Sequence, residues 1–410
     1  MAGFRTAVTH PISHHPEPKP AAGVPPPGRP GGHRRAVIVA AVVVLLAVAA
    51  VAGWADSRAG GYYAFQPGTA PTITTSSACR ANSAGSLVLP GGTPCARIVA
   101  PAGRATALHG QLLMVDVYVG KATPIEYALR AVGLLGSFFP GSQLLPDAAV
   151  LGTTPASQYA CQDNLDMGQA TTTAPLVAMS RLGYHVGSVN HGGSVYLVLP
   201  HSAASTAGLH CGDRIVAVDG TATPTAAAVA SAIHAHRPGD RVSIRVRRAT
   251  SKGTRTLTLQ ATLTGVPAIA GQPAHPSEAF LGVETQTDTT YNTPFPVQLQ
   301  VGNIGGPSAG LAMTLATLDA LSGGTLTGGH VVAATGTISP NGAVGDVGGV
   351  AQKTVAVERA GATLFLVPPQ ELAVARRVAR PGLVVKPVST LSQALADLSA
   401  IGGHVPAPAG

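Results

Sequence analysis

A serine in the last third of the chain stands in a setting that favours nucleophilic catalysis. Ser308 belongs to the segment GGPSAG (residues 305–310), and leucines follow it at helical spacing, which predicts that it lies at a helix N-terminus. Unpaired N–H groups and the helix dipole at that end would stabilise an oxyanion, with Gly306, Pro307 and Ala309 forming the surrounding backbone loop. Serine is also a common N-cap, so this segment alone leaves a purely structural role equally open.

A lysine in the second segment, GGVAQKTVAV (residues 348–357), could act as the base for that serine. A helix over this segment would place Lys353 on the same inner stripe as Val350, Thr354 and Val357. Burial disfavours the ammonium form and favours the neutral amine, which is the form that a general base requires. Taken alone, a lysine whose stem lies along the core while its head reaches water is the commoner case.

The two segments together resemble the proteolytic domain of Lon-type serine peptidases over residues 280–398. The motifs that carry the resemblance are GGPSAG (305–310), TGG (327–329), ATGTI (334–338), GAVG (342–345), Gly348-Gly349, Lys353 and AGA (360–362). The resemblance implies an α+β fold with Ser308 as nucleophile and Lys353 as its base. It also implies that Thr335 is a supporting residue that hydrogen-bonds near the pair.

Several positions depart from the pattern of cytoplasmic Lon enzymes. Gly305 stands where those enzymes usually have an aspartate, and Thr337 stands where they have a glutamate. Gln298 and Gln300 replace histidines that often precede the serine. The sequence contains no GxxxxGK[ST] phosphate loop, so we expect an ATP-independent endopeptidase without the Lon ATPase and without a cofactor or metal.

Two rival functions compete with this hypothesis. Residues 306–310 also fit G-x-S-x-G, the nucleophile elbow of α/β-hydrolases, but only His330 and His404 follow and neither is placed as a buried triad histidine. The second rival is a catalytically silent, membrane-anchored PDZ scaffold or adaptor. Retention of Ser308, Lys353 and Thr335 together argues against that alternative.

The segment before the proteolytic region resembles a PDZ domain over residues 185–263. The motifs are AGL (207–209), GD (212–213), IVAVDG (215–220) and PGD (238–240). PDZ modules bind an extended peptide by adding it as a strand beside a helix, so the resemblance implies recruitment of protein or peptide substrates. A groove that is filled internally, or a module that serves only as a spacer, is the alternative.

The N-terminal part predicts a membrane anchor. Residues 36–55 carry no charge and match the thickness of a bilayer, whereas Arg34 and Arg35 precede them, which places the N-terminus in the cytoplasm and the rest of the chain outside. A cleaved signal peptide is the alternative, because Ala50-Val51-Ala52 resembles a cleavage site. The whole arrangement resembles the bacterial membrane-anchored PDZ-Lon serine proteases.

Four cysteines, Cys79, Cys95, Cys161 and Cys211, follow the predicted span and would lie where disulfides persist. Four cysteines allow three pairings, and the Gly- and Pro-rich interval makes the first pair the easiest to close. Free buried thiols are the alternative. No CxxC spacing occurs, so a zinc site is not expected.

The formal net charge of +8 does not by itself predict a nucleic-acid partner, and we expect none outside the cytoplasm. Within VSIRVRR (residues 242–248) arginines alternate with apolar residues at period two, which predicts the solvated face of a half-buried strand. Contact of these arginines with anionic lipid or wall polymer is the alternative.

The predicted fold class is α+β and multidomain. It comprises a disordered tail (1–35), a transmembrane helix (36–55), an extracytoplasmic scaffold region (56–182), a PDZ domain that is rich in strands with helices (183–265), a linker (266–278), a C-terminal Lon-type α+β proteolytic domain (279–402) and a tail (403–410). The expected partners are protein or peptide substrates and the membrane, and the sequence is also compatible with a homo-oligomer.

Overall fold

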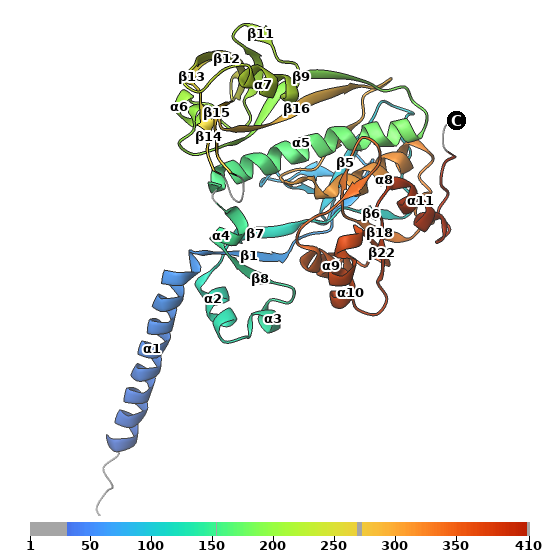
Figure 1. Ribbon diagram of the computed structural model, residues 1–410. Helices are drawn as coiled ribbons and strands as arrows, with labels where there is room; N and C mark the ends of the chain where they lie inside the picture. Colours follow the sequence, from blue (N-terminus) through green and yellow to red (C-terminus); the bar gives the residue numbers. More distant parts are fainter. Residues whose placement is uncertain (1–30, 153, 269–272, 408–410) are drawn as a thin grey trace, which may run out of the picture. The chain divides into compact units, whose positions relative to one another are not determined.

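The computed structural model describes residues 31–152, 154–268 and 273–407, with the side chains described from residue 43 onward (Figure 1). The chain divides into two units, residues 1–53 and 54–410. Helix α1 (Gly31–Ala59) covers the segment predicted to span a membrane and begins at Gly31 rather than at residue 36. A search of the described residues finds no helix that combines the length and the apolar character needed to cross a bilayer. The predicted tail lies outside the described residues up to residue 30.

The largest sheet has seven strands in the order β17-β5-β2-β6-β18-β21-β22. Their bounds are β2 (Thr72–Thr74), β5 (Cys95–Val99), β6 (Gln111–Leu113), β17 (Gln298–Gln300), β18 (Val331–Ala334), β21 (Leu364–Val367) and β22 (Val384–Pro387). Strand β6 pairs with β18 in parallel, with Leu112 opposite Val332. The region 56–182, predicted only as a scaffold, therefore supplies β2, β5 and β6 to the sheet of the proteolytic region.

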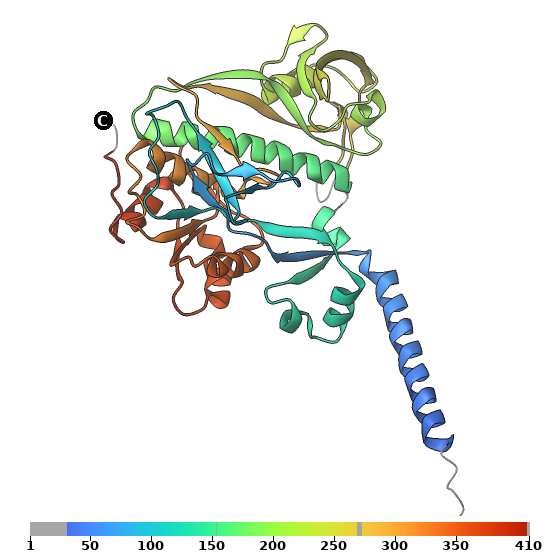
Figure 2. The same cartoon turned by 180° about the vertical axis from the view of Figure 1, so that it is seen from behind.

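Helices cover both faces of this sheet. Helices α5 (Ala156–Arg181), α8 (Gly310–Leu321) and α11 (Leu391–Ser399) share one apolar core with it, and α9 (Val350–Arg359) and α10 (Leu372–Val378) share the other. Successive strand residues point to opposite faces, so Leu112 enters the first core and Leu113 enters the second. Helix α8 is buried on all sides, and the views from front and back both show α5 lying beside it (Figures 1 and 2).

A smaller sheet is formed by three strands from residues 62–146. It has the order β7-β1-β8, with β1 (Tyr62–Pro67), β7 (Val117–Lys121) and β8 (Gln143–Pro146). Three short helices accompany it: α2 (Pro124–Ala131), α3 (Leu135–Phe138) and α4 (Asp147–Leu151). Two further strand pairs are β3 (Arg80–Ala81) with β4 (Leu87–Val88), and β19 (Thr337–Ile338) with β20 (Val344–Gly345). Short 3-10 turns are η1 (Pro307–Ala309) and η2 (Pro369–Glu371).

A third sheet forms the domain predicted over residues 183–265. Its order is β13-β12-β10-β9-β16, with β11 paired to β10. The strands are β9 (Gly187–Val198), β10 (Arg214–Val218), β11 (Thr221–Ala222), β12 (Arg241–Thr250), β13 (Gly253–Thr262) and β16 (Val283–Asn292), with helices α6 (Ala203–Ala207) and α7 (Ala226–His234). The sheet thus extends past residue 265, because β16 lies beyond the predicted linker. The ends of that linker also pair, as β14 (Thr264–Val266) with β15 (His275–Phe280).

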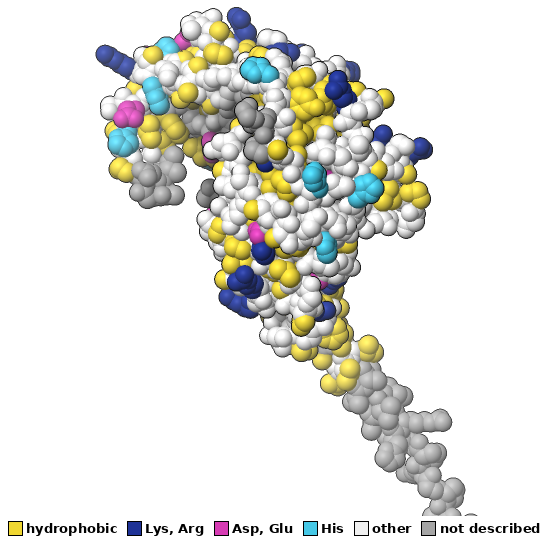
Figure 3. All heavy atoms as spheres, turned by 90° about the vertical axis from the view of Figure 1, so that its right-hand side faces the viewer, with side chains coloured by type: hydrophobic (Ala, Val, Ile, Leu, Met, Phe, Trp, Pro, Cys, Tyr) yellow, Lys and Arg dark blue, Asp and Glu magenta, His cyan; other side chains and the backbone are white. Residues whose placement is uncertain are grey.

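The arginine-rich strand β12 confirms the predicted half-buried pattern. Val242, Ile244 and Val246 are fully buried, whereas Arg245 and Arg247 are exposed. On the face drawn in Figure 3, lysine and arginine side chains lie at several separate places. The alternation of buried and exposed residues along β12 accounts for the arginine run.

Two disulfides are present. Cys79 pairs with Cys95, which confirms the pairing predicted as the easiest to close, and Cys161 pairs with Cys211. The second bond joins helix α5 to the turn before β10. No cysteine of the chain remains free in the structure, since all four belong to the described residues.

Candidate active site

Ser308 lies in η1, immediately before α8, as the sequence predicted. The turn is held from two sides: the N–H of Gly306 donates to the carbonyl oxygen of Asp163 at 2.9 Å, and the N–H of Gly336 donates to the carbonyl oxygen of Ser308 at 2.8 Å. Gly306 has a φ of 82°, a left-handed value that favours glycine. The backbone conformation around the serine therefore depends on this glycine.

Lys353 lies in the first turn of α9 and is only 3% exposed. The inner stripe predicted for this helix is confirmed, since Val350, Thr354 and Val357 are buried with it. The helix begins after Gly349, whose φ is 68° and whose carbonyl oxygen accepts a hydrogen bond from the Lys353 N–H at 2.9 Å. The lysine is thereby fixed at the start of a buried helix.

Thr335 lies between the serine and the lysine. It follows β18 and is fully buried. The Nζ of Lys353 donates to Thr335 Oγ1 at 3.2 Å, and Thr335 Oγ1 donates to the carbonyl oxygen of Ser308 at 3.1 Å. In the described structure no hydrogen bond joins the Ser308 hydroxyl directly to Lys353; the connection runs through Thr335.

Burial controls the charge of Lys353. Loss of hydration lowers the pKa of its amine to about 8, and the carboxylates of Glu371 and Asp116 oppose that shift. Asp116 is itself held in place, because its carboxylate accepts hydrogen bonds from the N–H and the hydroxyl of Thr69 at 2.6 and 2.8 Å. The amine therefore loses its proton within about a unit of neutral pH, unlike an exposed lysine.

Ser308 and Lys353 open into one cleft of about 880 Å³. The cleft also includes Pro307, Ala309 and the Gly348-Gly349 pair, and its opposite walls come from β1, β7, the loop 301–305 and the start of α5. Its charged lining residues are Asp116, Asp163 and Lys353. The structure thus brings together every site residue proposed from the sequence for the proteolytic region. Gly306 lies in the turn that carries Ser308.

Two residues of the cleft were not identified from the sequence. Asp116 and Asp163 come from the region between residues 56 and 182, in which no recognisable spacing of acid, base and nucleophile occurs. One signal was available: Gly305 departs from the aspartate of cytoplasmic Lon enzymes. A side-chain Cβ on Gly305 would lie 3.2 Å from the Cβ of Asp163, so the neighbouring helix fills that space.

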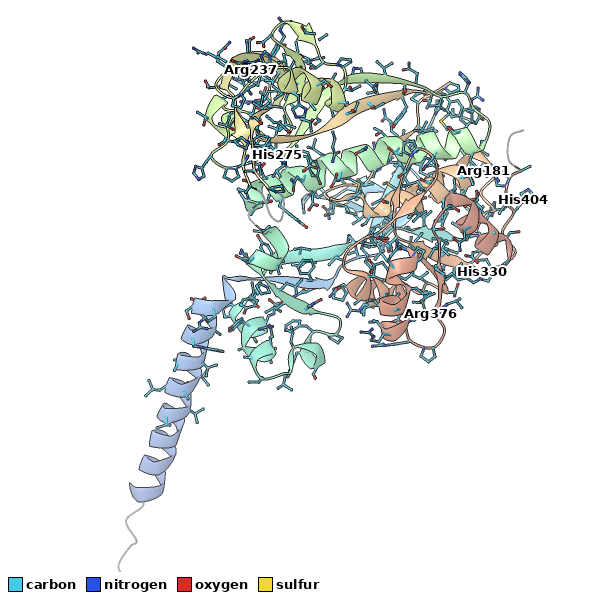
Figure 4. The ribbon with its side chains drawn as sticks, in the orientation of Figure 1. Arg181, Arg237, His275, His330, Arg376 and His404 are labelled. Atoms are coloured by element: carbon cyan, nitrogen blue, oxygen red, sulfur yellow. A yellow bond between two sulfur atoms is a disulfide. The ribbon has the colours of Figure 1, made fainter. Side chains whose placement is uncertain are left out.

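The two histidines that follow Ser308 lie away from it. Both His330 and His404 are exposed, and neither lines the cleft (Figure 4). A Ser-His-acid triad on residues 306–310 would require a histidine beside the serine. The geometry therefore gives no support to the α/β-hydrolase alternative.

The third sheet has an outer edge that lies beside a helix. Strand β16 ends the sheet order, and α7 begins beside it, with the N–H of Ala226 donating to Thr287 Oγ1 at 3.1 Å. A strand edge next to a helix is the geometry that adds an extended peptide. This domain contacts α5 through Gln158, whose side chain bonds the N–H and carbonyl of Val198 at 2.6 and 3.0 Å.

Comparisons with known proteins assign both regions. Residues 180–263 match the family model of the PDZ domain, and residues 286–398 match that of the Lon protease (S16) C-terminal proteolytic domain. Two crystal structures of PDZ domains of SdrC-like proteins are similar, each 24% identical with a TM-score of 0.19 and covering 23% of this chain. The domain from Listeria monocytogenes is covered over 87% of its length and that from Listeria innocua over 92%. The family matches confirm the two resemblances predicted from the motifs, to a PDZ domain and to the Lon proteolytic domain.

Proposed function

We propose that this protein is an endopeptidase with Ser308 as nucleophile and Lys353 as general base, because it contains a PDZ domain and a Lon-type serine peptidase domain. The observation that carries the proposal is the state of Lys353: a buried amine, its pKa lowered to about 8, in the same cleft as Ser308. A general base works best when its pKa lies near the operating pH.

The proposed reaction has two steps. Neutral Lys353 takes the proton of the Ser308 hydroxyl as its oxygen attacks the scissile carbonyl carbon, and the resulting ammonium gives that proton to the departing amine. Water then hydrolyses the acyl ester with Lys353 again as base. The backbone of Gly306, Pro307, Ser308 and Ala309 surrounds the position where the oxyanion develops, at the N-terminal end of α8.

Thr335 is proposed as the residue that positions the base. Its hydroxyl holds Lys353 Nζ and is in turn anchored on the Ser308 carbonyl, so both partners depend on one side chain. Catalytic hydrogen bonds are often long in unliganded sites and tighten when substrate binds. A direct contact between Lys353 Nζ and the Ser308 hydroxyl is thus expected in the substrate complex.

We further propose that no ATP is used and that the PDZ domain recruits substrates. The absence of a phosphate loop from the sequence means that substrates must arrive unfolded or flexible. The outer edge of β16 beside α7 would hold an extended segment of the substrate protein while another segment enters the cleft.

The proposed location is outside the cytoplasm, with a membrane anchor over residues 36–55. Two disulfides fit an oxidising compartment, and Arg34 and Arg35 before the uncharged segment favour a cytoplasmic N-terminus. Protease added to intact spheroplasts should then degrade residues 56–410. Protection of the C-terminal domain until the membrane is dissolved would contradict this location.

The activity is tested with the full-length chain in detergent, without ATP, on unstructured fluorogenic peptides. Wild type should cleave them, and Ser308→Ala should lose at least about 1,000-fold in kcat/KM, because removing a nucleophile leaves only binding and oxyanion stabilisation. Peptides left uncut by a folded wild type that still binds them would favour the non-catalytic scaffold.

A further inference from the structure

The cleft beside Ser308 contains a carboxylate for which the proposed hydrolysis has no use. Asp163 belongs to α5, which lies before the PDZ domain and outside the residues matched by the peptidase family. Its carbonyl oxygen accepts the hydrogen bond from Gly306, and its Cβ packs against Gly305. Asp163 is therefore fixed against the same turn that carries Ser308.

The carboxylate of Asp163 differs from that of Asp116, the other carboxylate of the cleft, in having no hydrogen-bond partner among the described residues. Of the charged lining residues, Asp116 is satisfied by Thr69, and Lys353 must be neutral to act as base. Within the described residues, the side chain of Asp163 makes no hydrogen bond and no ion pair. It is half-buried, so it cannot be fully hydrated either, and burial together with the nearby Asp166 raises its pKa.

We infer, taking the proposed peptidase activity as the premise, that Asp163 is a specificity determinant that selects substrates with a lysine or arginine beside the scissile bond. A cationic side chain entering the cleft would pair with a carboxylate that otherwise stays partly dehydrated and unpaired. An acidic side chain would meet repulsion, and a neutral one would leave the charge uncompensated. Such discrimination comes from the position of Asp163 on α5 and is separate from the chemistry of Ser308 and Lys353.

The test uses the full-length chain and sets of fluorogenic peptides that differ only next to the scissile bond, where they carry Lys, Met or Glu. Wild type should prefer Lys over Met by about tenfold in kcat/KM, the size expected for a partly buried ion pair. Asp163→Asn keeps the backbone carbonyl oxygen that accepts the Gly306 N–H, and it should cleave the Lys and Met peptides equally well. Asp163→Lys should prefer Glu.

Asp166→Asn is the matched control. Asp166 lies one helical turn from Asp163 and also has a raised pKa, but its carboxylate accepts the Tyr196 hydroxyl at 2.8 Å and lines no part of the cleft. This variant should keep the preference for Lys. A preference that persists in Asp163→Asn, or a loss that is equal for all three peptides, would overturn the inference.

The outcome also separates this inference from the proposed function. If wild type cleaves Lys, Met and Glu peptides alike and Ser308→Ala cleaves none, the peptidase stands and the role of Asp163 is overturned. If wild type and Ser308→Ala cleave the same peptides, or neither cleaves any, the proposed function itself fails. The inference about Asp163 then fails too, because it rests on that function.

Discussion

At the scale of single residues, the proposed mechanism depends on the pH at which the Lys353 amine loses its proton. A lysine in water titrates near pH 10.4, whereas burial in α9 lowers the pKa of Lys353 to about 8. The direction follows from the geometry, because Lys353 as a residue is 3% exposed and the fixed partner of its amine is a neutral hydroxyl. Glu371 and Asp116 keep the pKa from falling further.

The pH profile should report this pKa. We expect kcat/KM to rise with pH through an inflection near 8, because the neutral amine is the active form. Glu371→Gln removes a negative charge that favours the ammonium, so its inflection should lie at lower pH. Glu358→Gln removes a charge from α9, the helix that carries Lys353, and should leave the inflection at the wild-type pH. A wild-type profile that is flat between pH 6 and about 9 would contradict the assignment of Lys353 as base.

A second buried titratable residue should affect stability instead of activity. Asp319 in α8 is fully buried, and burial raises the pKa of its carboxyl from 3.8 to about 6, although the Leu326 N–H and His109 act in the opposite direction. The folded state then binds the proton more tightly than the unfolded state does. This contribution is present below pH 3.8 and is lost as pH rises through about 6.

Asp319→Asn should therefore stabilise the protein at pH 8, by at most about 3 kcal/mol, while Oδ1 still accepts the Leu326 N–H. Urea unfolding of both proteins between pH 5 and 8 measures this difference. The stability of wild type should fall more steeply over that range than the stability of the variant. Parallel curves would show that Asp319 does not titrate there.

At the scale of elements, the start of α9 positions the base. A Cβ on Gly349 would stand 2.7 Å from Val117 Cγ2 on β7, and the residue is left-handed, whereas a Cβ on the neighbouring Gly348 would meet no atom within 4 Å. Gly349→Ala should lower the free energy of unfolding by about 1–3 kcal/mol and reduce activity, because α9 must shift. Gly348→Ala is the control for stability and should unfold like wild type, because its Cβ meets no atom. Equal effects of the two substitutions would contradict this role of Gly349.

The elements with a strong local pattern were predictable from the sequence. The alternation in β12 has a period of two residues, and the inner stripe around Lys353 has a period of about 3.6 residues. Both periods can be read from neighbouring residues of the sequence. The parallel pairing of β6 with β18 joins residues about 220 positions apart, and no local pattern encodes it. For the same reason Asp116 and Asp163 were missed, since both reach the cleft only through that long-range assembly.

At the scale of the whole molecule, the disulfides should differ in what they contribute. The bond Cys161–Cys211 closes a loop of 50 residues and joins α5 to the PDZ domain, whereas Cys79–Cys95 closes one of 16. Loop-closure entropy predicts about 4 and about 3 kcal/mol respectively. Thermal unfolding of the two double Cys→Ser variants should show the lower midpoint for the 161/211 pair. The reverse order of the two midpoints would show that loop-closure entropy does not determine which disulfide stabilises the protein more.

The pairing of β16 with β9 also limits how the modules can be separated. A deletion of residues 185–263 would remove β9 and leave β16 without its neighbour, so it would disturb more than recruitment. Substitutions on the outer edge of β16 are the cleaner way to separate binding of protein substrates from hydrolysis of peptides. This coupling arises because the domain is inserted between α5 and β17.

The central claim is that Ser308 and Lys353 act as one catalytic unit, and the rate at which a fluorophosphonate labels Ser308 tests it most directly. The full-length wild type should be labelled at Ser308 at pH 8, and Lys353→Ala and Lys353→Arg should both be labelled at least about 100-fold more slowly, because neither supplies a neutral amine. Circular dichroism must show that the variants are folded. Labelling of Lys353→Arg at the wild-type rate would contradict the Ser-Lys mechanism.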